Sequence, residues 1–117
     1  MTCEYDVYQH LKRLGAPANL RGYGFMHRAV IKVLGNEEYA RAITKALYPE
    51  IAAEFGARAS QVERDIRHLV TYIFDNTDVD ILYDYFGNTI SKKTGKLTNS
   101  QFIAGLANYI KMEANHD

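Results

Sequence analysis

The segment at about residues 48–75 constrains the fold most, because it combines a proline, a glycine and one long apolar stripe. Pro49 suits the first turn of a helix and would break a helix interior, so a new short helix begins there. Gly56 supplies the turn that ends this helix. The apolar residues that follow recur at helical spacing and form one stripe: Val62, Ile66, Leu69, Val70 and Ile73. The segment therefore predicts a helix-turn-helix, with a short helix, a tight turn and a longer helix.

Helical periodicity continues along nearly the whole chain, and no stretch shows convincing strand alternation. Because 47% of the 117 residues are hydrophobic, the chain can bury one core, and we expect a single all-α domain over residues 1–117. The pattern indicates about six helices. Outside the helix-turn-helix, helices are expected at about 3–14, 20–34, 36–46 and 79–86, and after a capped start at 98–101, with a basic loop at 88–97.

Residue types at the expected helix ends support these boundaries. Asn36 can cap the third helix, and Thr77 or Asp78 can cap the helix that follows the helix-turn-helix. The run Thr-Asn-Ser-Gln at 98–101 has the residues of a capped start for the last helix. Three residues of the short helix are expected to face inward: Ile51, Ala52 and Phe55.

The charge of the chain is balanced overall but unevenly distributed. Fourteen Lys plus Arg equal fourteen Asp plus Glu, which taken alone argues against binding to nucleic acid. One acidic stretch without Lys or Arg contains Asp75, Asp78, Asp80 and Asp84. The stretch 85–112 contains four lysines and no acid: Lys92, Lys93, Lys96 and Lys111. This pattern predicts separate cationic and anionic surfaces.

Several function classes find no support in the sequence. The apolar runs fall far short of the roughly 20 residues that span a membrane, and no signal peptide is evident, so we expect a cytoplasmic protein. The single cysteine, Cys3, is expected to be an ordinary, partly buried thiol. The four histidines have no metal-ligand spacing, and no nucleophile and base are paired. We therefore expect no metal, no cofactor and no enzyme activity.

Two short motifs favour structure over ligand binding. The run Arg-Gly-Tyr-Gly at 21–24 has no strand before it and does not complete a phosphate-binding loop. It predicts a helix start with close backbone packing. The aspartate-rich run at 75–80 lacks the glycine and the closing glutamate of an EF-hand, so caps and solvated charges are expected there.

The longer helix of the helix-turn-helix has a polar face opposite its apolar stripe. That face carries Ser60, Gln61, Arg64, Arg67, His68 and Thr71, with Glu63 and Asp65 on its flanks. Arginine pairs with guanine, glutamine with adenine and glutamate with cytosine in the major groove. Gln61, Glu63, Arg64 and Arg67 therefore form a sensible set for reading bases. A solvated amphipathic helix is the alternative, with about even odds on periodicity alone.

Lysines of the expected basic loop are candidates for contact with the DNA backbone. They are Lys92, Lys93 and Lys96. Phosphate contact and a flexible solvated loop are equally good interpretations, because lysines also occur in loops for solubility. The absence of acids around them favours contact slightly.

Six segments, taken in order along the chain, resemble one known family. They are RGY at 21–23, MHRAV at 26–30, ITKALYPEIA at 43–52, VERDIRH at 62–68, FG at 86–87 and TNSQFIA at 98–104. These segments resemble the C-terminal DNA-binding effector domain of stage zero sporulation protein A, the response regulator of endospore-forming bacteria. The resemblance spans nearly the whole chain in unbroken order. It is far more specific than a generic helix-turn-helix match.

The resemblance implies a six-helix, response-regulator effector-like domain that binds a promoter box in double-stranded DNA, commonly as tandem copies. It also implies contact with RNA polymerase, through which transcription is activated or repressed. Glu63, Arg64 and Arg67 match the family's major-groove and nearby backbone contacts, and Lys96 matches a basic position in the loop before the last helix. Ser60 and His68 complete the expected DNA-binding set from the outward face.

Three departures from the family pattern bear on function. Gln61 replaces an arginine and removes a bidentate guanine contact, whereas Asp65 replaces a small residue and is expected to add negative charge beside the groove. Altered sequence preference or weakened binding follows. The family's regulator also carries an N-terminal receiver, for which 117 residues leave no room. Control would then come from abundance, oligomerisation or a partner; an excised part of a longer protein is the alternative.

Two functions follow from these observations. The leading hypothesis is a sequence-specific DNA-binding transcription regulator with its recognition helix in the major groove. The alternative, suggested by the zero net charge and Asp65, is an interaction module that has lost DNA binding. Such a module would modulate a full-length regulator or RNA polymerase through the acidic surface at 75–84.

Overall fold

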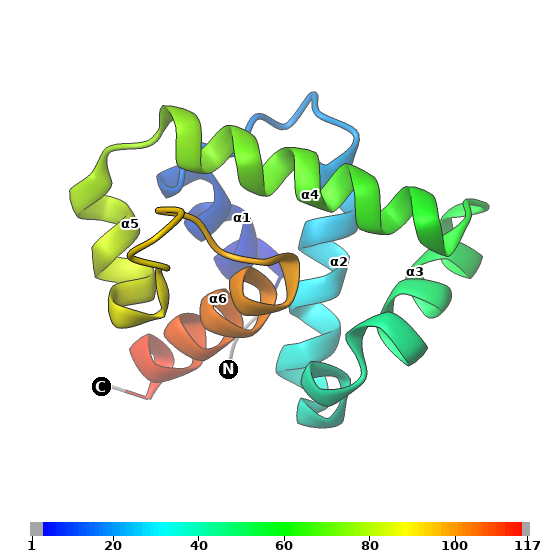
Figure 1. Ribbon diagram of the computed structural model, residues 1–117. Helices are drawn as coiled ribbons and strands as arrows, with labels where there is room; N and C mark the ends of the chain where they lie inside the picture. Colours follow the sequence, from blue (N-terminus) through cyan, green and yellow to red (C-terminus); the bar gives the residue numbers. More distant parts are fainter. Residues whose placement is uncertain (1–3, 116–117) are drawn as a thin grey trace.

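The computed structural model describes residues 4–115, which form six α-helices joined by short 3-10 and π-helical turns (Figure 1). The α-helices are α1 (Glu4–Arg13), α2 (Gly22–Gly35), α3 (Tyr48–Phe55), α4 (Ala59–Asn76), α5 (Val79–Phe86) and α6 (Asn99–Ala114). These residues contain no strand, so the prediction of an all-α fold is confirmed. Within the same range, none of the helices has the length and apolar character that crossing a membrane requires. Cys3 and His116 lie outside the described residues.

The longest helix, α4, lies across α2 and α6, while α3 and α5 lie near its two ends (Figure 1). The predicted apolar stripe of α4 is buried, as expected. It belongs to one core that also contains fully buried side chains from other helices, among them Leu11, Met26, Ile51 and Phe102. One side of α4 is thus fixed in the core, and its opposite side is left for solvent or a partner.

The crossing of α2 and α4 is close enough to require a glycine. A Cβ atom added to Gly22 would lie 2.1 Å from the carbonyl oxygen of Asp65. Any larger residue would therefore push the two backbones apart. The predicted close backbone packing at the start of α2 is confirmed, and it fixes the distance between the start of α2 and the middle of α4.

The expected continuous helix at 36–46 was the main error in the predicted elements. A 3-10 helix (Glu37–Arg41) is followed by a π-helix (Ile43–Leu47), and Ala42 between them has φ −141° and ψ 45°. Asn36 does cap the first turn, accepting a hydrogen bond from the backbone of Glu38. The break lets Ile43 and Leu47 reach the core, a long-range requirement that local periodicity does not contain.

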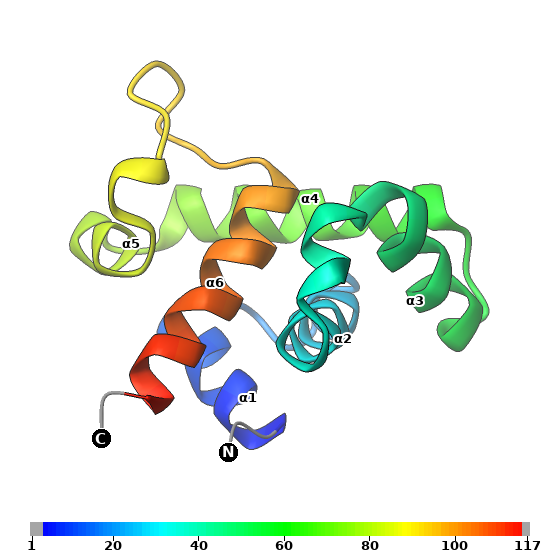
Figure 2. The same cartoon turned by 90° about the horizontal axis from the view of Figure 1, so that it is seen from below.

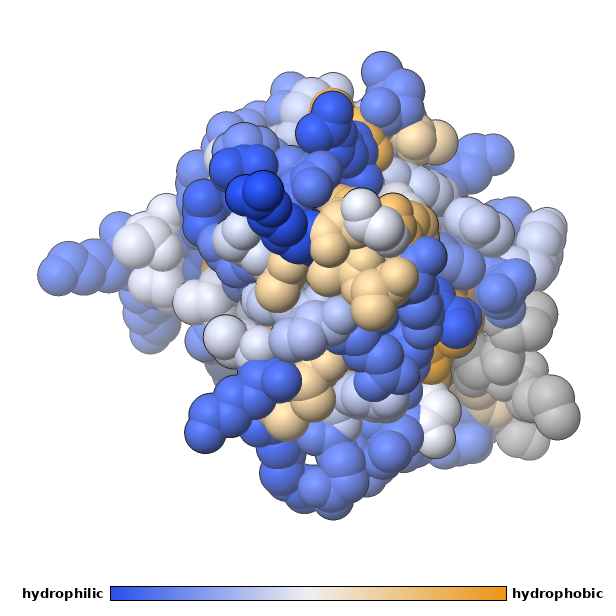
Figure 3. Space-filling model, turned by 90° about the vertical axis from the view of Figure 1, so that its right-hand side faces the viewer, coloured by the Kyte–Doolittle hydropathy of each residue, from blue (hydrophilic) through white to orange (hydrophobic). Residues whose placement is uncertain are grey.

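The turn between α3 and α4 follows the prediction, but one of its side chains does not. Gly56 has φ 65°, the left-handed conformation that favours glycine at a helix end. Ile51 and Ala52 are buried as expected, whereas Phe55 is 50% exposed. Its ring packs edge-on against Phe25, with centroids 5.1 Å apart, because Phe25 already fills the core position. The face that carries α3 is mostly hydrophilic, with small apolar patches between polar side chains (Figure 3).

Later helix ends agree closely with the sequence. Asp78 caps α5, which ends at Gly87 with φ 51°. Thr98 and Gln101 form a reciprocal capping box at the start of α6. These signals lie within a few residues of the ends that they define, which explains why they could be recognised.

A charged network joins α3 to α2 and fixes the first helix of the helix-turn-helix. Lys32 Nζ lies 2.8 Å from a carboxylate oxygen of Glu50 and 2.6 Å from one of Glu54, and Arg28 Nε donates to Glu54 at 2.8 Å. The Tyr39 hydroxyl donates to Glu50 at 2.6 Å. Hydrogen bonds from Lys32 and from Arg28 hold the pKa values of Glu50 and Glu54, respectively, below their ordinary value.

Candidate nucleic-acid interface

The outward face of α4 lies where the sequence predicts it. Ser60, Arg64 and Arg67 follow one another along a single exposed ridge, and His68 is exposed beside them. Gln61 and Glu63 flank the ridge and are half-buried. The ridge is continuous with the turn at Gly56, so the N-terminal half of α4 is open to a partner.

The two arginines of the ridge differ in their surroundings. Arg67 Nη1 donates to both carboxylate oxygens of Glu63, at 2.5 and 2.6 Å. Arg64 is exposed and forms no ion pair with any residue in the described range 4–115. The Arg64 guanidinium is therefore the one more readily available to a new acceptor, while Glu63 holds Arg67 in a defined orientation.

A groove of about 330 Å³ lies between α4, the π-helix and the start of α6, and its lining contains both Arg67 and Lys96. Hydroxyl groups of Thr44, Thr71 and Ser100 also line it. The structure thus places a cation from the recognition helix and a cation from the loop before α6 on one surface. Cations and hydroxyls on one groove are the groups with which proteins contact phosphate oxygens.

Lys92 and Lys93 do not line this groove. They are exposed in the loop between α5 and α6, the segment that projects furthest from the helices in Figure 2. Ile90 and Leu97 at the two ends of the loop are buried and anchor it. The structure therefore brings Lys96 to the α4 groove and leaves the other two lysines at the projecting part of the loop.

The predicted separation of cationic and anionic surfaces is wrong. Lys96 Nζ lies 3.2 Å from a carboxylate oxygen of Asp75, near the end of α4. Asp84 likewise pairs with Arg13 at 3.3 Å. Sequence distance misled the prediction here, because the chain folds the basic loop back over the acidic stretch.

Asp65 is also not where the sequence placed it. The prediction was a negative charge on the flank beside the groove, but the residue is only 9% exposed, and its Oδ2 has no hydrogen-bond partner among the described residues. It lies under the start of α2, at the close crossing with Gly22. The carboxylate therefore does not stand beside the exposed ridge of α4. Its burial without a partner for Oδ2 costs free energy of folding instead.

Asn99 lines the same groove and was not among the residues singled out from the sequence. Its amide nitrogen donates to the backbone carbonyl of Glu63 at 2.9 Å and to the Tyr48 hydroxyl at 3.2 Å. Sequence reasoning assigned it only to a capped helix start. No local signal shows which distant carbonyl a side chain at that position will meet.

The buried histidine His10 joins α1, α5 and α6. Its Nδ1 lies 2.6 Å from the Tyr85 hydroxyl and its Nε2 lies 2.9 Å from the Glu113 carboxylate. Burial raises the pKa of Tyr85 to about 12, so its hydroxyl stays protonated and can donate to Nδ1. His10 is thus a structural bridge. In residues 4–115, no group of three or more His, Cys, Asp or Glu side chains is placed to hold a metal ion.

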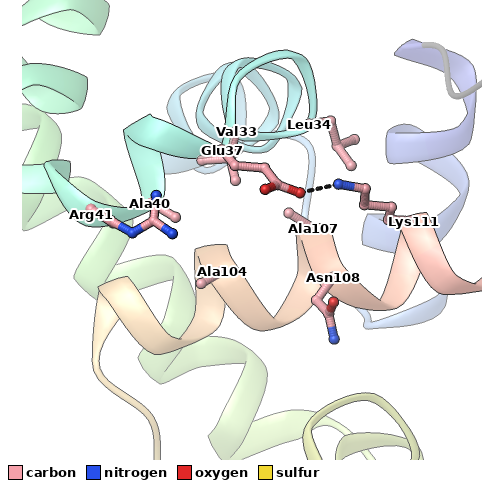
Figure 4. A pocket seen from close by; sticks show the side chains of 9 residues that line it. All are labelled: Val33, Leu34, Glu37, Ala40, Arg41, Ala104, Ala107, Asn108 and Lys111. Carbon is pink, nitrogen blue, oxygen red and sulfur yellow. Dashed lines mark hydrogen bonds and ion pairs between the residues drawn. The ribbon is translucent and has the colours of Figure 1, made fainter.

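Another pocket, of about 240 Å³, lies between the end of α2, the 3-10 helix and α6, away from the α4 ridge (Figure 4). Small and aliphatic side chains form much of its wall, including Val33, Ala40 and Ala107. Its two cations are already paired, Lys111 with Glu37 and Arg41 with Glu38. The pocket therefore lacks the unpaired charge that would attract a charged ligand.

The arrangement is that of the helix-turn-helix class of DNA-binding domains. It consists of a short helix, a glycine turn and a second helix with an exposed arginine ridge, and a lysine-bearing loop lies beside it. The family model for "Sporulation initiation factor Spo0A C terminal" matches residues 7–110. The chain belongs to this family. It is therefore related to the DNA-binding effector domain of the sporulation response regulator, a family of DNA-binding domains rather than enzymes.

Proposed function

We propose that this chain is a sequence-specific transcription regulator that places α4 in the major groove of a promoter box. The observation that carries the proposal is the exposed ridge of Ser60, Arg64 and Arg67, because Arg67 also lines a groove that contains Lys96. Membership of the Spo0A C-terminal family supports it independently. Zero net charge does not oppose it, because contact with DNA depends on the local arrangement of Arg64, Arg67 and Lys96 rather than on the overall balance.

Each residue of the ridge has a role that its chemistry suits. Arg64, unpaired within residues 4–115, donates bidentately to a guanine. Glu63 accepts from a cytosine amino group while it orients Arg67 toward a base or the adjacent backbone. Gln61 reads adenine, which would give this chain a preference different from that of relatives with arginine there.

The remaining candidate residues contact the sugar-phosphate backbone. Lys96 reaches a phosphate from the groove beside Arg67. Lys92 and Lys93 contact the flanking backbone from the projecting loop, and Ser60 and His68 add contacts at the edges of the ridge. These contacts set orientation and affinity rather than sequence preference.

Selection from a pool of random duplexes at low salt tests this function. The wild-type chain should enrich one box. Arg64→Ala should bind that box about 5- to 150-fold more weakly, the loss expected for a bidentate guanine contact of about 1–3 kcal/mol. Arg13→Ala is the matched control, because Arg13 is an exposed arginine paired with Asp84, and neither residue lines the groove. If no sequence is enriched at low salt, the proposed function is wrong.

The partners on DNA follow from the family. Binding as tandem copies on adjacent boxes is part of this proposal, as is contact between the bound chain and RNA polymerase. Band shifts with one box and with two correctly spaced boxes distinguish single from tandem binding. Tandem binding predicts a higher affinity for the second copy on the double box than on separate boxes.

A second candidate function is an interaction module that uses α5 rather than α4. The observation that favours it is the exposure of Val79 and Tyr83, 57% and 52%, on either side of Asp80. Immobilised chain would then retain RNA polymerase or the full-length regulator, and Tyr83→Ala would release it. Robust binding to a selected box, together with no retained protein, contradicts this alternative.

A further inference from the structure

Asn99 connects two parts of the interface that are far apart in the sequence. Its Nδ2 lies 2.9 Å from the carbonyl oxygen of Glu63 on α4 and 3.2 Å from the hydroxyl oxygen of Tyr48 on α3. An amide nitrogen carries two hydrogens, so Asn99 can donate to both acceptors at once. One side chain therefore joins α6 to both helices of the helix-turn-helix.

The capping box at the start of α6 fixes the orientation of Asn99. Gln101 N donates to Thr98 Oγ1 at 3.1 Å, and Thr98 N donates to Gln101 Oε1 at 3.0 Å. Asn99 is the first residue of α6, so its backbone is held within this reciprocal cap. The amide is therefore presented to α4 from a rigid element rather than from a loop.

The position of Asn99 matters because it lies between the two cations of the groove. Lys96 precedes it by three residues, with the buried Leu97 between them. Arg67 lies one helical turn after Glu63, whose carbonyl accepts from Asn99. The Asn99–Glu63 bond therefore ties the backbone of the Lys96 loop to α4, while the pair with Asp75 holds the Lys96 ammonium group itself.

We propose that Asn99 is a positioning residue for DNA recognition, which holds α4 and the Lys96 loop in the register that lets base and phosphate contacts form together. This role rests on the proposed function. Asn99 acts through Glu63 and Lys96 and does not itself touch the DNA. When the amide is lost, the base contacts of α4 and the phosphate contact of Lys96 can each still form, but they can no longer form at the same time.

Asn99→Leu tests the role, because leucine has nearly the same shape, no donors and no change of charge. The probes are the duplex that the wild-type chain selects and the unselected random pool. We expect affinity for the selected duplex to fall about tenfold, the loss expected for one to two hydrogen bonds, with little change for the pool. The matched control is Asn108→Leu on the exposed side of α6, whose amide contacts only Met112 Sδ among the described residues.

A double variant separates positioning from mere loss of stability. In a Lys96→Ala background, Asn99→Leu should cost clearly less than tenfold, because the contact that it positions is already gone. Circular dichroism at the assay temperature verifies that each variant is folded. If Asn99→Leu does not fold, Asn99→Ala replaces it, since alanine removes the donors without adding a charge, and the same fall in the selected-to-pool affinity ratio is expected.

The outcomes are distinguishable. A wild-type chain that selects no duplex overturns the proposed function and, with it, this role. In a second outcome, the wild-type chain selects a duplex, but a folded Asn99 variant keeps the wild-type ratio of affinity for the selected duplex to affinity for the pool. That result overturns the positioning role alone. The role is also overturned if the double variant loses as much binding free energy as the sum of the losses from Asn99→Leu and Lys96→Ala.

Discussion

At the scale of single residues, charge alone does not show which arginine of α4 is available. Arg64 and Arg67 lie three residues apart on one ridge, yet only Arg67 has an acidic partner within the described residues. The pairing gives Arg67 a fixed direction, while Arg64 keeps its full set of donors for a base. The proposed readout is therefore divided between a guanidinium without an ion pair and one that Glu63 orients.

Gly22 makes the tightest testable packing contact near the interface. Gly22→Ala should lower the free energy of unfolding by about 1–3 kcal/mol or more, because its Cβ would lie 2.1 Å from the Asp65 carbonyl oxygen. Urea unfolding followed by circular dichroism measures the loss. Gly35→Ala is the control, since its Cβ would meet nothing within 4 Å, and it should leave stability unchanged or slightly higher. Equal effects of the two changes would show that α2 and α4 do not cross so closely.

Single residues also mark where prediction from sequence stops. Pro49, Gly56, Gly87 and Thr98 act within a few residues of their own position, and each helix end that they predict is present. Asp65 is different, because the periodicity puts it on a flank of α4 and only the position of α2 decides that the flank is covered. Its burial was not predictable from α4 alone.

At the scale of elements, the loop before α6 is held by an acid at the end of α4. Lys96 pairs with Asp75, so a DNA phosphate must compete with a carboxylate for the same ammonium group. We therefore expect the acidic stretch to reduce the proposed DNA binding through a direct contact as well as through its overall charge.

Asp75→Asn should raise DNA affinity by a few fold, because it frees Lys96 for a phosphate. The measurement is binding to the selected duplex over a range of salt concentrations, where the increase should be largest at low salt. Asp80→Asn removes the same charge from the exposed surface of α5 without touching Lys96. An equal gain from both variants would mean that only net charge matters, and would exclude a specific role for the pair.

The elements of the candidate site were predictable to different degrees. Local propensity and period identified α4, its ridge and its apolar side, because these depend on residues within one helix. The groove depends on three separate elements, and two of its residues, Glu63 and Asn99, are 36 positions apart in the sequence. The break at Ala42 and the exposure of Phe55 have the same origin, since packing against other helices overrode the local period.

At the scale of the whole molecule, ion pairs between helices tie the periphery to the core. Glu50 and Glu54 join α3 to α2, and Glu37 joins the 3-10 helix to Lys111 on α6. Cationic partners hold the pKa of each of these carboxyls below its ordinary value of 4.5. The folded chain therefore binds fewer protons than the unfolded chain in mild acid.

This difference predicts a loss of stability in acid. The contribution of these carboxylates is present above their unfolded pKa, near 4.5, and is lost as the pH falls through their lower folded values. The urea midpoint should therefore be lower in acid than at neutral pH. The double variant Glu50→Gln, Glu54→Gln should be less stable at neutral pH, and its urea midpoint should depend less on pH than that of the wild-type chain. A wild-type midpoint that stays constant across this range would contradict the role of these pairs.

The central claim is that the α4 ridge reads bases in the major groove, and methylation interference on the selected duplex tests it most directly. A methyl group on guanine N7 blocks the edge that Arg64 would contact. The wild-type chain should fail to bind duplexes methylated at one or more guanines of the box, and Arg64→Ala should lose that sensitivity at one of them. Wild-type binding that is indifferent to N7 methylation throughout the box would contradict the claim.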